Sequence, residues 1–280
     1  MVEKNSTNLT LMSWNIKSGG FNSYDPSLTI PERENDIRTI IDDAHGNRGV
    51  NAVTLIDAYR WDEVYGDDQD IAHHIGYADA RFVRLHDERL ERDNGSGIGI
   101  AFGTDIIIEQ SRPLDLETRC GLGVILAIGH YGLQVANVYL DDLSEEVRLK
   151  QIKALINDLE PDIPTVLVGD FNMLRPEMSG ASFENRAKDL ALRSLTRILP
   201  RRGLGATIID MNKRQGVPLI ESLGFNDADR RKKQPTAPSR LPIFGVDYVF
   251  HDNKVRVDSM DVISTKKSSD HAAIVVDLRL

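Results

Sequence analysis

Chemically active side chains follow several strand-like segments of this sequence, at the point where each segment ends. Residues 165–168 form an apolar, largely β-branched run, and the tetrapeptide Gly-Asp-Phe-Asn follows directly at 169–172. The carboxyl ends of buried strands are where α/β proteins place their chemistry. Asp170 and Asn172 are therefore candidates for holding a cation or a phosphate group.

Three other strand-like segments carry groups of the same kind. Asn15, Asp57 and the pair Asp270 and His271 each stand at the boundary of an apolar run. Carboxylates and amides provide the oxygen ligands that Mg²⁺ and Mn²⁺ prefer. Asn15, Asp57 and Asp270 thus supply an oxygen-rich set that suits a hard cation.

Taken in order, these segments resemble the motifs of the endonuclease/exonuclease/phosphatase superfamily of Mg²⁺-dependent phosphoesterases. Those motifs read W-N, L-Q-E, G-D-x-N, I-D-Y and S-D-H. The corresponding residues are Trp14-Asn15, Leu55-Ile56-Asp57, Gly169-Asp170-Phe171-Asn172, Val246-Asp247-Tyr248 and Ser269-Asp270-His271. Because all five motifs occur in the right order, the resemblance covers nearly the whole chain.

The resemblance implies a Mg²⁺ site, or a Mn²⁺ site, formed by Asn15, Asp57 and Asp270. Asp57 stands where the family has a metal-binding Glu, so its carboxylate is retracted by about one methylene. Either the strand moves inward or a water molecule fills the gap, and the affinity for the metal could fall. A different role for Asp57 is an ion pair with the neighbouring Arg60.

The remaining motif residues resemble the catalytic groups of the family. Asp170 corresponds to the residue that orients or deprotonates the attacking water, and Asn172 to the amide that helps hold water and phosphate. His271 corresponds to the histidine that binds phosphate oxygens as an imidazolium, and Asp247 to the acceptor that orients it. The alternatives are an Asx turn at Asp170 and a surface histidine at position 271.

Tyr139 distinguishes between branches of the superfamily. Sphingomyelinases, pancreatic-type deoxyribonucleases and many phosphatases carry His at this position, whereas AP endonucleases and related exonucleases carry Tyr. Tyr139 therefore favours the nuclease branch. The alternative is a strand aromatic that only packs. Two departures argue against abasic-site repair: residues 241–247 contain no Trp, and Asp142 replaces a phosphate-binding Asn. We therefore expect a member resembling the broad, mostly uncharacterised bacterial group.

The elements predicted around the motifs alternate between helix and strand. Ile37, Ile40 and Ile41 have helical spacing within 32–43, and Ser144 marks a helix that stops before Pro161. Further helices are expected at 183–199 and 219–223, and strands at 97–102, 123–128, 133–140, 165–168, 247–250 and 273–278. This order predicts an α/β fold. The resemblance sharpens it to a four-layer α/β sandwich, with two mixed sheets packed face to face, helices outside and the site at one edge.

Composition indicates one domain spanning residues 1–280. The chain is 41% hydrophobic and can bury a substantial core, while its single cysteine, Cys120, excludes an internal disulfide. No stretch approaches the roughly 18–20 apolar residues of a membrane helix, and residues 1–10 are polar. We therefore expect a soluble, cytoplasmic protein.

The charge distribution bears on the substrate. A formal net charge of −9 argues against a generally basic nucleic-acid-binding surface. Residues 201–240 nevertheless contain nine Lys or Arg against four Asp or Glu, including the run Arg230, Arg231, Lys232 and Lys233. This run is either a substrate-binding cradle for a polyanion or a solvated loop.

These observations predict a hydrolase: a Mg²⁺-dependent phosphodiesterase, and more narrowly a nuclease, that uses in-line attack of water. One rival is a phosphatase or phospholipase-like enzyme acting on a small phosphate ester or a lipid headgroup. Another is a binding protein of the same fold that has lost turnover, suggested by the replacement at Asp57.

Overall fold

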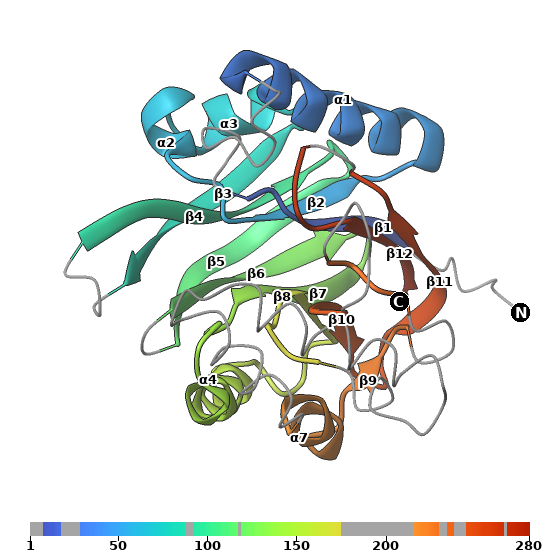
Figure 1. The fold of residues 1–280 in the computed structure, drawn as a ribbon. Helices are drawn as coiled ribbons and strands as arrows, with labels where there is room; N and C mark the ends of the chain where they lie inside the picture. Colours follow the sequence, from blue (N-terminus) through green and yellow to red (C-terminus); the bar gives the residue numbers. More distant parts are fainter. Residues whose placement is uncertain are drawn as a thin grey trace, which may run out of the picture.

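Two mixed six-stranded sheets pack face to face and are flanked by helices (Figure 1). The computed structural model describes residues 8–17, 29–87, 92–116, 119–174, 215–229, 234–237, 245–265 and 268–280. The first sheet has the order β11 (Arg256–Ile263), β12 (Ala273–Arg279), β1 (Asn8–Asn15), β2 (Ala52–Ile56), β4 (Arg92–Phe102) and β3 (Asp79–Asp87). The second has the order β5 (Ile106–Leu116), β6 (Arg119–Ile128), β7 (Tyr131–Tyr139), β8 (Thr165–Asp170), β10 (Asp247–His251) and β9 (Asn226–Asp227).

The helices form the two outer layers. On the first sheet lie α1 (Ile30–Arg48), α2 (Trp61–Val64) and α3 (Asp68–His74), and on the second lie α4 (Glu145–Asn157) and α7 (Gly216–Ser222). The predicted four-layer α/β sandwich is confirmed. None of the helices among the described residues is long and apolar enough to cross a membrane.

Alternating side chains of each strand separate the core into layers. In β1, Leu9 and Leu11 face the apolar space between the sheets, while Met12 and Trp14 pack under α1. A strand buried on both faces must be apolar on both faces, because successive side chains point in opposite directions. This explains why the centres of β1, β2 and β8 carry apolar residues on both faces.

Local capping signals set the helix boundaries. Thr29 and Glu32 form a capping box at the start of α1, and the helix ends at Gly49, which has φ 66°. Helix α1 is therefore longer than the predicted 32–43. Ser144 caps α4 as predicted, by accepting a hydrogen bond from the Val147 backbone.

Sequence patterns missed mainly the edges of the sheets. Strands β3, β5, β9 and β11 were not predicted, and all four lie at the edge of a sheet. Edge strands carry polar and charged residues because one side faces solvent, which weakens the hydrophobic pattern. The helix expected at 183–199 and the basic run Arg230–Lys233 lie outside the described residues.

Parallel and antiparallel pairing bring the motif residues to one edge of the sandwich. In the first sheet β1 runs parallel to β2, and β12 begins beside the end of β1 because these two strands are antiparallel. In the second sheet β7 is parallel to β8 and β10 is antiparallel to it, so Tyr139 and Asp247 both lie beside Asp170. The ends of β1, β2, β7 and β8 and the beginnings of β10 and β12 therefore meet.

Close approach of β7 and β8 at this edge depends on Gly169. Its φ is 138°, and a Cβ atom there would lie 2.1 Å from the carbonyl oxygen of Val138. Only glycine accommodates both that conformation and that contact. The glycine of the Gly-Asp-Phe-Asn motif thus sets the spacing between Tyr139 and Asp170.

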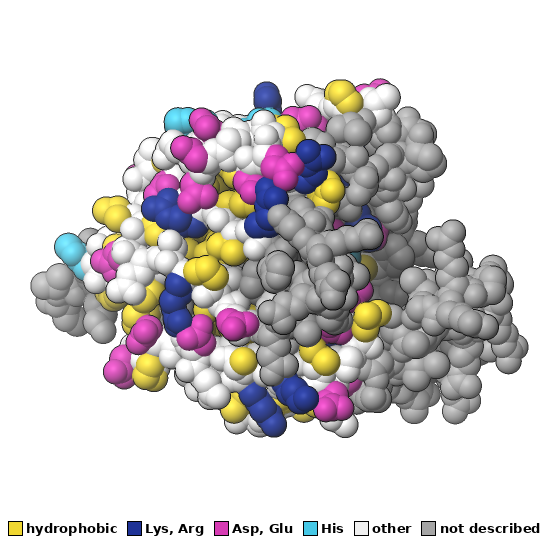
Figure 2. All heavy atoms as spheres, turned by 90° about the vertical axis from the view of Figure 1, so that its left-hand side faces the viewer, with side chains coloured by type: hydrophobic (Ala, Val, Ile, Leu, Met, Phe, Trp, Pro, Cys, Tyr) yellow, Lys and Arg dark blue, Asp and Glu magenta, His cyan; other side chains and the backbone are white. Residues whose placement is uncertain are grey.

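Charged side chains of both signs share the surface. Figure 2 shows one face of the molecule, on which acidic and basic side chains of the described residues are interspersed. Such mixing is typical of a solvated protein surface rather than of a track for a polyanion.

A buried amide links the two sheets behind the motif residues. Asn137 on β7 is fully buried, and its Nδ2 donates hydrogen bonds to the carbonyl oxygens of Leu55 on β2 (3.1 Å) and Gly99 on β4 (3.0 Å). A polar contact across an apolar layer fixes one sheet relative to the other, because sliding would leave these groups buried without partners.

We expect Asn137→Ala to lower the free energy of unfolding by about 2–4 kcal/mol, since it leaves two buried carbonyls without this donor and creates a cavity. Urea denaturation would measure the loss. Asn253→Ala, at an exposed position, is the matched control and should change stability by less than about 0.5 kcal/mol. Equal effects of the two substitutions would contradict a linking role for Asn137.

Candidate active site

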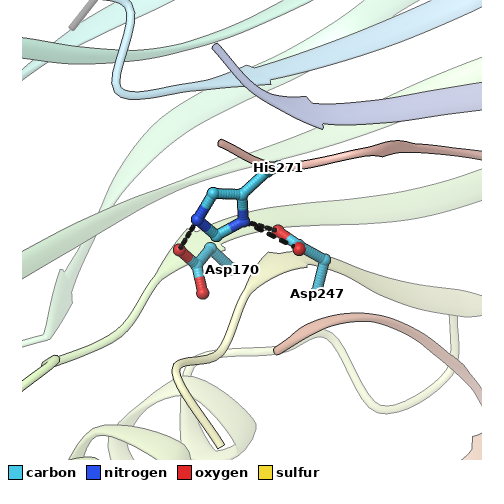
Figure 3. Close-up of side chains that lie close together, drawn as sticks. All are labelled: Asp170, Asp247 and His271. Atoms are coloured by element: carbon cyan, nitrogen blue, oxygen red, sulfur yellow. Dashed lines mark hydrogen bonds and ion pairs between the residues drawn. The ribbon is translucent and has the colours of Figure 1, made fainter. Parts of the chain in front are cut away.

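His271 lies between two aspartates that the chain supplies from different strands (Figure 3). Its Nδ1 is 2.8 Å from Oδ2 and 3.1 Å from Oδ1 of Asp247, the first residue of β10. Its Nε2 is 3.9 Å from Oδ2 of Asp170, the last residue of β8. The predicted contact between His271 and Asp247 is present, and the histidine side chain is only 12% exposed.

Asp170 is held by hydrogen bonds on both oxygens. Asn172 donates its backbone N–H to Oδ1 at 2.9 Å, which is the Asx turn that the sequence allowed, and Asn172 has φ 50°. Asn15 donates its Nδ2 to Oδ2 at 3.0 Å. The turn therefore does not exclude a catalytic role, because it directs Oδ2 toward Asn15 and His271.

The two halves of the site perturb each other's protonation. Burial raises the pKa of Asp170 to about 7, with a contribution from Asp247 and opposition from His271. Burial alone would lower the pKa of His271, but the Asp247 and Asp170 carboxylates outweigh it and raise that pKa to about 10. His271 is therefore an imidazolium at neutral pH, the form that binds anionic oxygens.

The first and last motifs are joined by hydrogen bonds from side chains to backbone carbonyl groups. Trp14 donates its indole Nε1 to the carbonyl oxygen of His271 at 3.1 Å, and Ser269 donates its Oγ to the carbonyl oxygen of Asn15 at 2.6 Å. The end of β1 and the loop before β12 consequently move as one unit.

Two of the three predicted metal ligands, Asn15 and Asp270, contact Lys17. Asp270 Oδ2 is 3.0 Å from Lys17 Nζ, and Asn15 Oδ1 accepts the Lys17 backbone N–H at 3.0 Å. Asp57 has φ 56° and accepts a hydrogen bond from Ser96 Oγ at 2.6 Å. Partial burial lowers the pKa of Lys17, yet the carboxylates of Asp270, Asp57 and Asp170 raise it overall.

These donors suit a divalent cation. Asp270 Oδ1 is buried and accepts no hydrogen bond among the described residues, although it lies 3.9 Å from His271 Nε2, so this oxygen can serve as a ligand. The other donors of the set are an amide and a second carboxylate, the chemistry that Mg²⁺ and Mn²⁺ require. The fit rests on the Asp270 Oδ1 atom, which accepts no hydrogen bond among the described residues, and on the negative charge beside Lys17.

Asp170, Asp247 and His271 form another group whose ligand atoms lie within 4.8 Å of one another. A metal ion there would require a neutral imidazole, because an imidazolium has no lone pair to donate. In the metal-free protein the raised pKa of His271 favours the charged form instead. We therefore favour the set of Asn15, Asp57 and Asp270 as the metal ligands.

Sequence reasoning missed Arg33, which fixes the loops that carry the ligands. Arg33 is fully buried on α1 and donates hydrogen bonds to the carbonyl oxygens of Ile16, Lys17 and Ser268. Burial lowers its pKa, while the carboxylates of Asp270 and Asp57 act in the opposite direction. An arginine within an apolar helical pattern was the available signal.

Tyr139 lies beside an ion pair that the sequence did not predict. The Arg119 guanidinium is 4.5 Å from the centre of the Tyr139 ring, and its Nη2 is 2.9 Å from Asp142 Oδ1. Asp142 is thus neutralised rather than left to repel phosphate. Burial raises the pKa of Tyr139 well above its ordinary value, so its hydroxyl remains a neutral hydrogen-bond donor.

Comparison with known proteins gives the chain a family context. A family model described as Endonuclease/Exonuclease/phosphatase family matches residues 12–271. No match is found among curated proteins.

Solved structures share the fold at low sequence identity. A Bacteroides thetaiotaomicron endonuclease/exonuclease/phosphatase family protein is 14% identical, with a TM-score of 0.69 and 99% of each chain covered. A mannosyl-6-phosphatase from the same organism is 13% identical, with a TM-score of 0.67, covering 96% of this chain and 99% of that one. ANGEL2, a 2′,3′-cyclic phosphatase, is 17% identical, with a TM-score of 0.66, covering 99% and 97%.

We expect Asp247→Asn to lower the pKa of His271 from about 10 toward or below its ordinary value of 6.5, because burial then acts against the charged form with less opposition. NMR titration of labelled histidine in EDTA, over about pH 5–10, measures the shift. His251 is the internal control, since its Nδ1 contacts the backbone carbonyls of Asp252 and Val255. An unchanged titration of His271 would show that Asp247 does not govern its charge.

Proposed function

Because this chain belongs to the endonuclease/exonuclease/phosphatase family and is a hydrolase of phosphoester bonds, we propose that it is a Mg²⁺- or Mn²⁺-dependent phosphodiesterase. The observation that carries the proposal is the line of Asp247, His271 and Asp170 beside Asp270, whose Oδ1 lies 3.9 Å from His271 Nε2 and accepts no hydrogen bond among the described residues. It combines a cation for phosphate oxygens, a carboxylate for water and a ligand for a metal ion.

Each group has a role in in-line attack on phosphorus. His271, kept charged by Asp247, stabilises negative charge on the non-bridging phosphoryl oxygens. Asp170 orients the attacking water or accepts its proton. Asn172 helps hold the water and the phosphate.

The metal ion contributes to the same step. When bound by Asn15, Asp57 and Asp270, a divalent cation would neutralise charge on the phosphoryl group and stabilise the leaving oxygen. Ser96 holds Asp57 in place for this role through its hydrogen bond. The shorter side chain of Asp57 leaves room for a bridging water molecule.

The substrate that we favour is a nucleic acid. Tyr139 can donate a hydrogen bond to a phosphate, and Arg119 cancels the charge of Asp142 that would otherwise oppose phosphate binding. The run Arg230, Arg231, Lys232 and Lys233 would hold the flanking phosphates of a polymer. This makes the protein a nuclease in our proposal.

A small phosphoester is the second candidate substrate. The formal net charge of −9 does not favour a long polyanion. Among the similar structures are a mannosyl-6-phosphatase and a 2′,3′-cyclic phosphatase. A phosphomonoester or a cyclic nucleotide is therefore the alternative.

Activity should require both Asp170 and a divalent ion. We expect EDTA to abolish hydrolysis, Mg²⁺ or Mn²⁺ to restore it, and Asp170→Asn to lower kcat by about 100-fold or more. Plasmid DNA, single-stranded DNA, RNA, bis-p-nitrophenyl phosphate and p-nitrophenyl phosphate form the substrate panel. Asp162→Asn, at an exposed position, is the matched control. Full activity in EDTA would refute the proposal.

The basic run provides the test of polymer binding. Replacing Arg230, Arg231, Lys232 and Lys233 together by alanine should flatten the dependence of log K on log salt for duplex DNA by on the order of three to four units, because fewer counterions are released. Binding titrations over a range of salt concentrations give the slope. Turnover of bis-p-nitrophenyl phosphate should barely change. Equal effects on the polymer and the small ester, or no effect on either, would favour the small-substrate enzyme.

A further inference from the structure

Lys17 carries its positive charge into the group of carboxylates that we propose as metal ligands. Its Nζ is 3.0 Å from Asp270 Oδ2, and its backbone N–H donates to Asn15 Oδ1. One proposed ligand is thus paired with the ammonium, and another holds the lysine backbone. Lys17 therefore lies where a divalent cation would experience the same attraction.

The backbone around Lys17 is fixed, although its side chain is 44% exposed. Lys17 has φ 47°, a left-handed conformation that is uncommon for residues other than glycine. Its N–H donates to Asn15 Oδ1, and its carbonyl oxygen accepts from the fully buried Arg33. Because both polar groups of its backbone are hydrogen-bonded, the Lys17 side chain starts from a fixed position close to Asp270.

Lys17 and a metal ion cannot use Asp270 independently. An ion ligated by Asp270 would lie about 2.0–2.6 Å from its oxygen, so it and the ammonium would be only a few ångströms apart. Like charges at that separation repel. Lys17 pairs with Asp270 Oδ2, whereas Asp270 Oδ1 accepts no hydrogen bond among the described residues and lies 3.9 Å from His271 Nε2.

We propose that Lys17 is a built-in counter-cation of the metal centre, which neutralises Asp270 and its neighbours in the metal-free protein and competes with the divalent ion for them. The inference rests on the proposed function, because it takes Asn15, Asp57 and Asp270 as the ligands. Lys17 is a positioning residue: it keeps the carboxylates together and lowers the affinity of the centre for the metal.

Removing the charge of Lys17 tests its competition with the divalent cation, because metal binding can be measured without an activity assay. Lys17→Met should bind Mn²⁺ at least about fivefold more tightly than the natural protein, as measured by calorimetry after removal of metals. Its melting temperature in EDTA should fall, and the rise on adding Mn²⁺ should be larger. Lys17→Arg, which keeps the charge, should bind Mn²⁺ within about twofold of the natural protein.

Lys150→Met is the matched control, because Lys150 pairs with Glu146 at 3.3 Å on the exposed face of α4 and should leave Mn²⁺ binding unchanged. If Lys17→Met does not fold, Lys17→Gln replaces it, since its amide can still donate to Asp270.

The outcomes separate this inference from the proposed function. Mn²⁺ binding that is lost in Asp270→Asn but unchanged or weaker in Lys17→Met would overturn the role of Lys17 alone. Binding only after Lys17 is replaced would support the competition in its strongest form. Failure of the natural protein and of Lys17→Met to bind Mn²⁺ would overturn both proposals.

Discussion

Gathering carboxylates at the junction of two sheets is the constraint on which the rest of this site depends. Buried acids repel one another and lose hydration, so each needs a compensating partner. His271 contacts Asp247, and Lys17 forms an ion pair with Asp270. Asp170 accepts hydrogen bonds from the Asn15 side chain and the Asn172 backbone. The chemistry of the site follows from these pairings, because they decide which oxygens remain available to a metal ion, a water molecule or a phosphate.

The arrangement of strands makes that gathering geometrically possible. Each sheet contains one parallel pair, β1 with β2 and β7 with β8, and the ends of these pairs face each other across the sandwich. An antiparallel neighbour in each sheet then returns to the same edge with Asp247 or His271. Asn137 and Gly169 fix the spacing just behind this edge, one by bridging the sheets and the other by admitting a close backbone contact.

The sequence predicted the parts of this molecule whose physical signature is local. Strand β8 could be recognised because burial on both faces demands a continuous apolar run, and α4 because Ser144 is a capping residue. Strands β3, β5 and β11 could not, since at the edge of a sheet they carry polar residues. The motif acids were recognisable from their order and spacing, whereas Lys17 and Ser96 reach Asp270 and Asp57 only after folding, and Arg119 reaches Asp142 in the same way. The sequence next to Lys17, Ser96 and Arg119 does not predict these contacts.

Through Arg33, helix α1 helps to position the site, although the helix carries none of the proposed catalytic groups. One guanidinium joins the helix to the carbonyls of Ile16 and Lys17 on one side and of Ser268 on the other. A rotation or a shift of the helix would pull on both loops at once. A design that transfers these motifs to another scaffold would therefore have to include helix α1, because the Arg33 hydrogen bonds connect both loops to that helix.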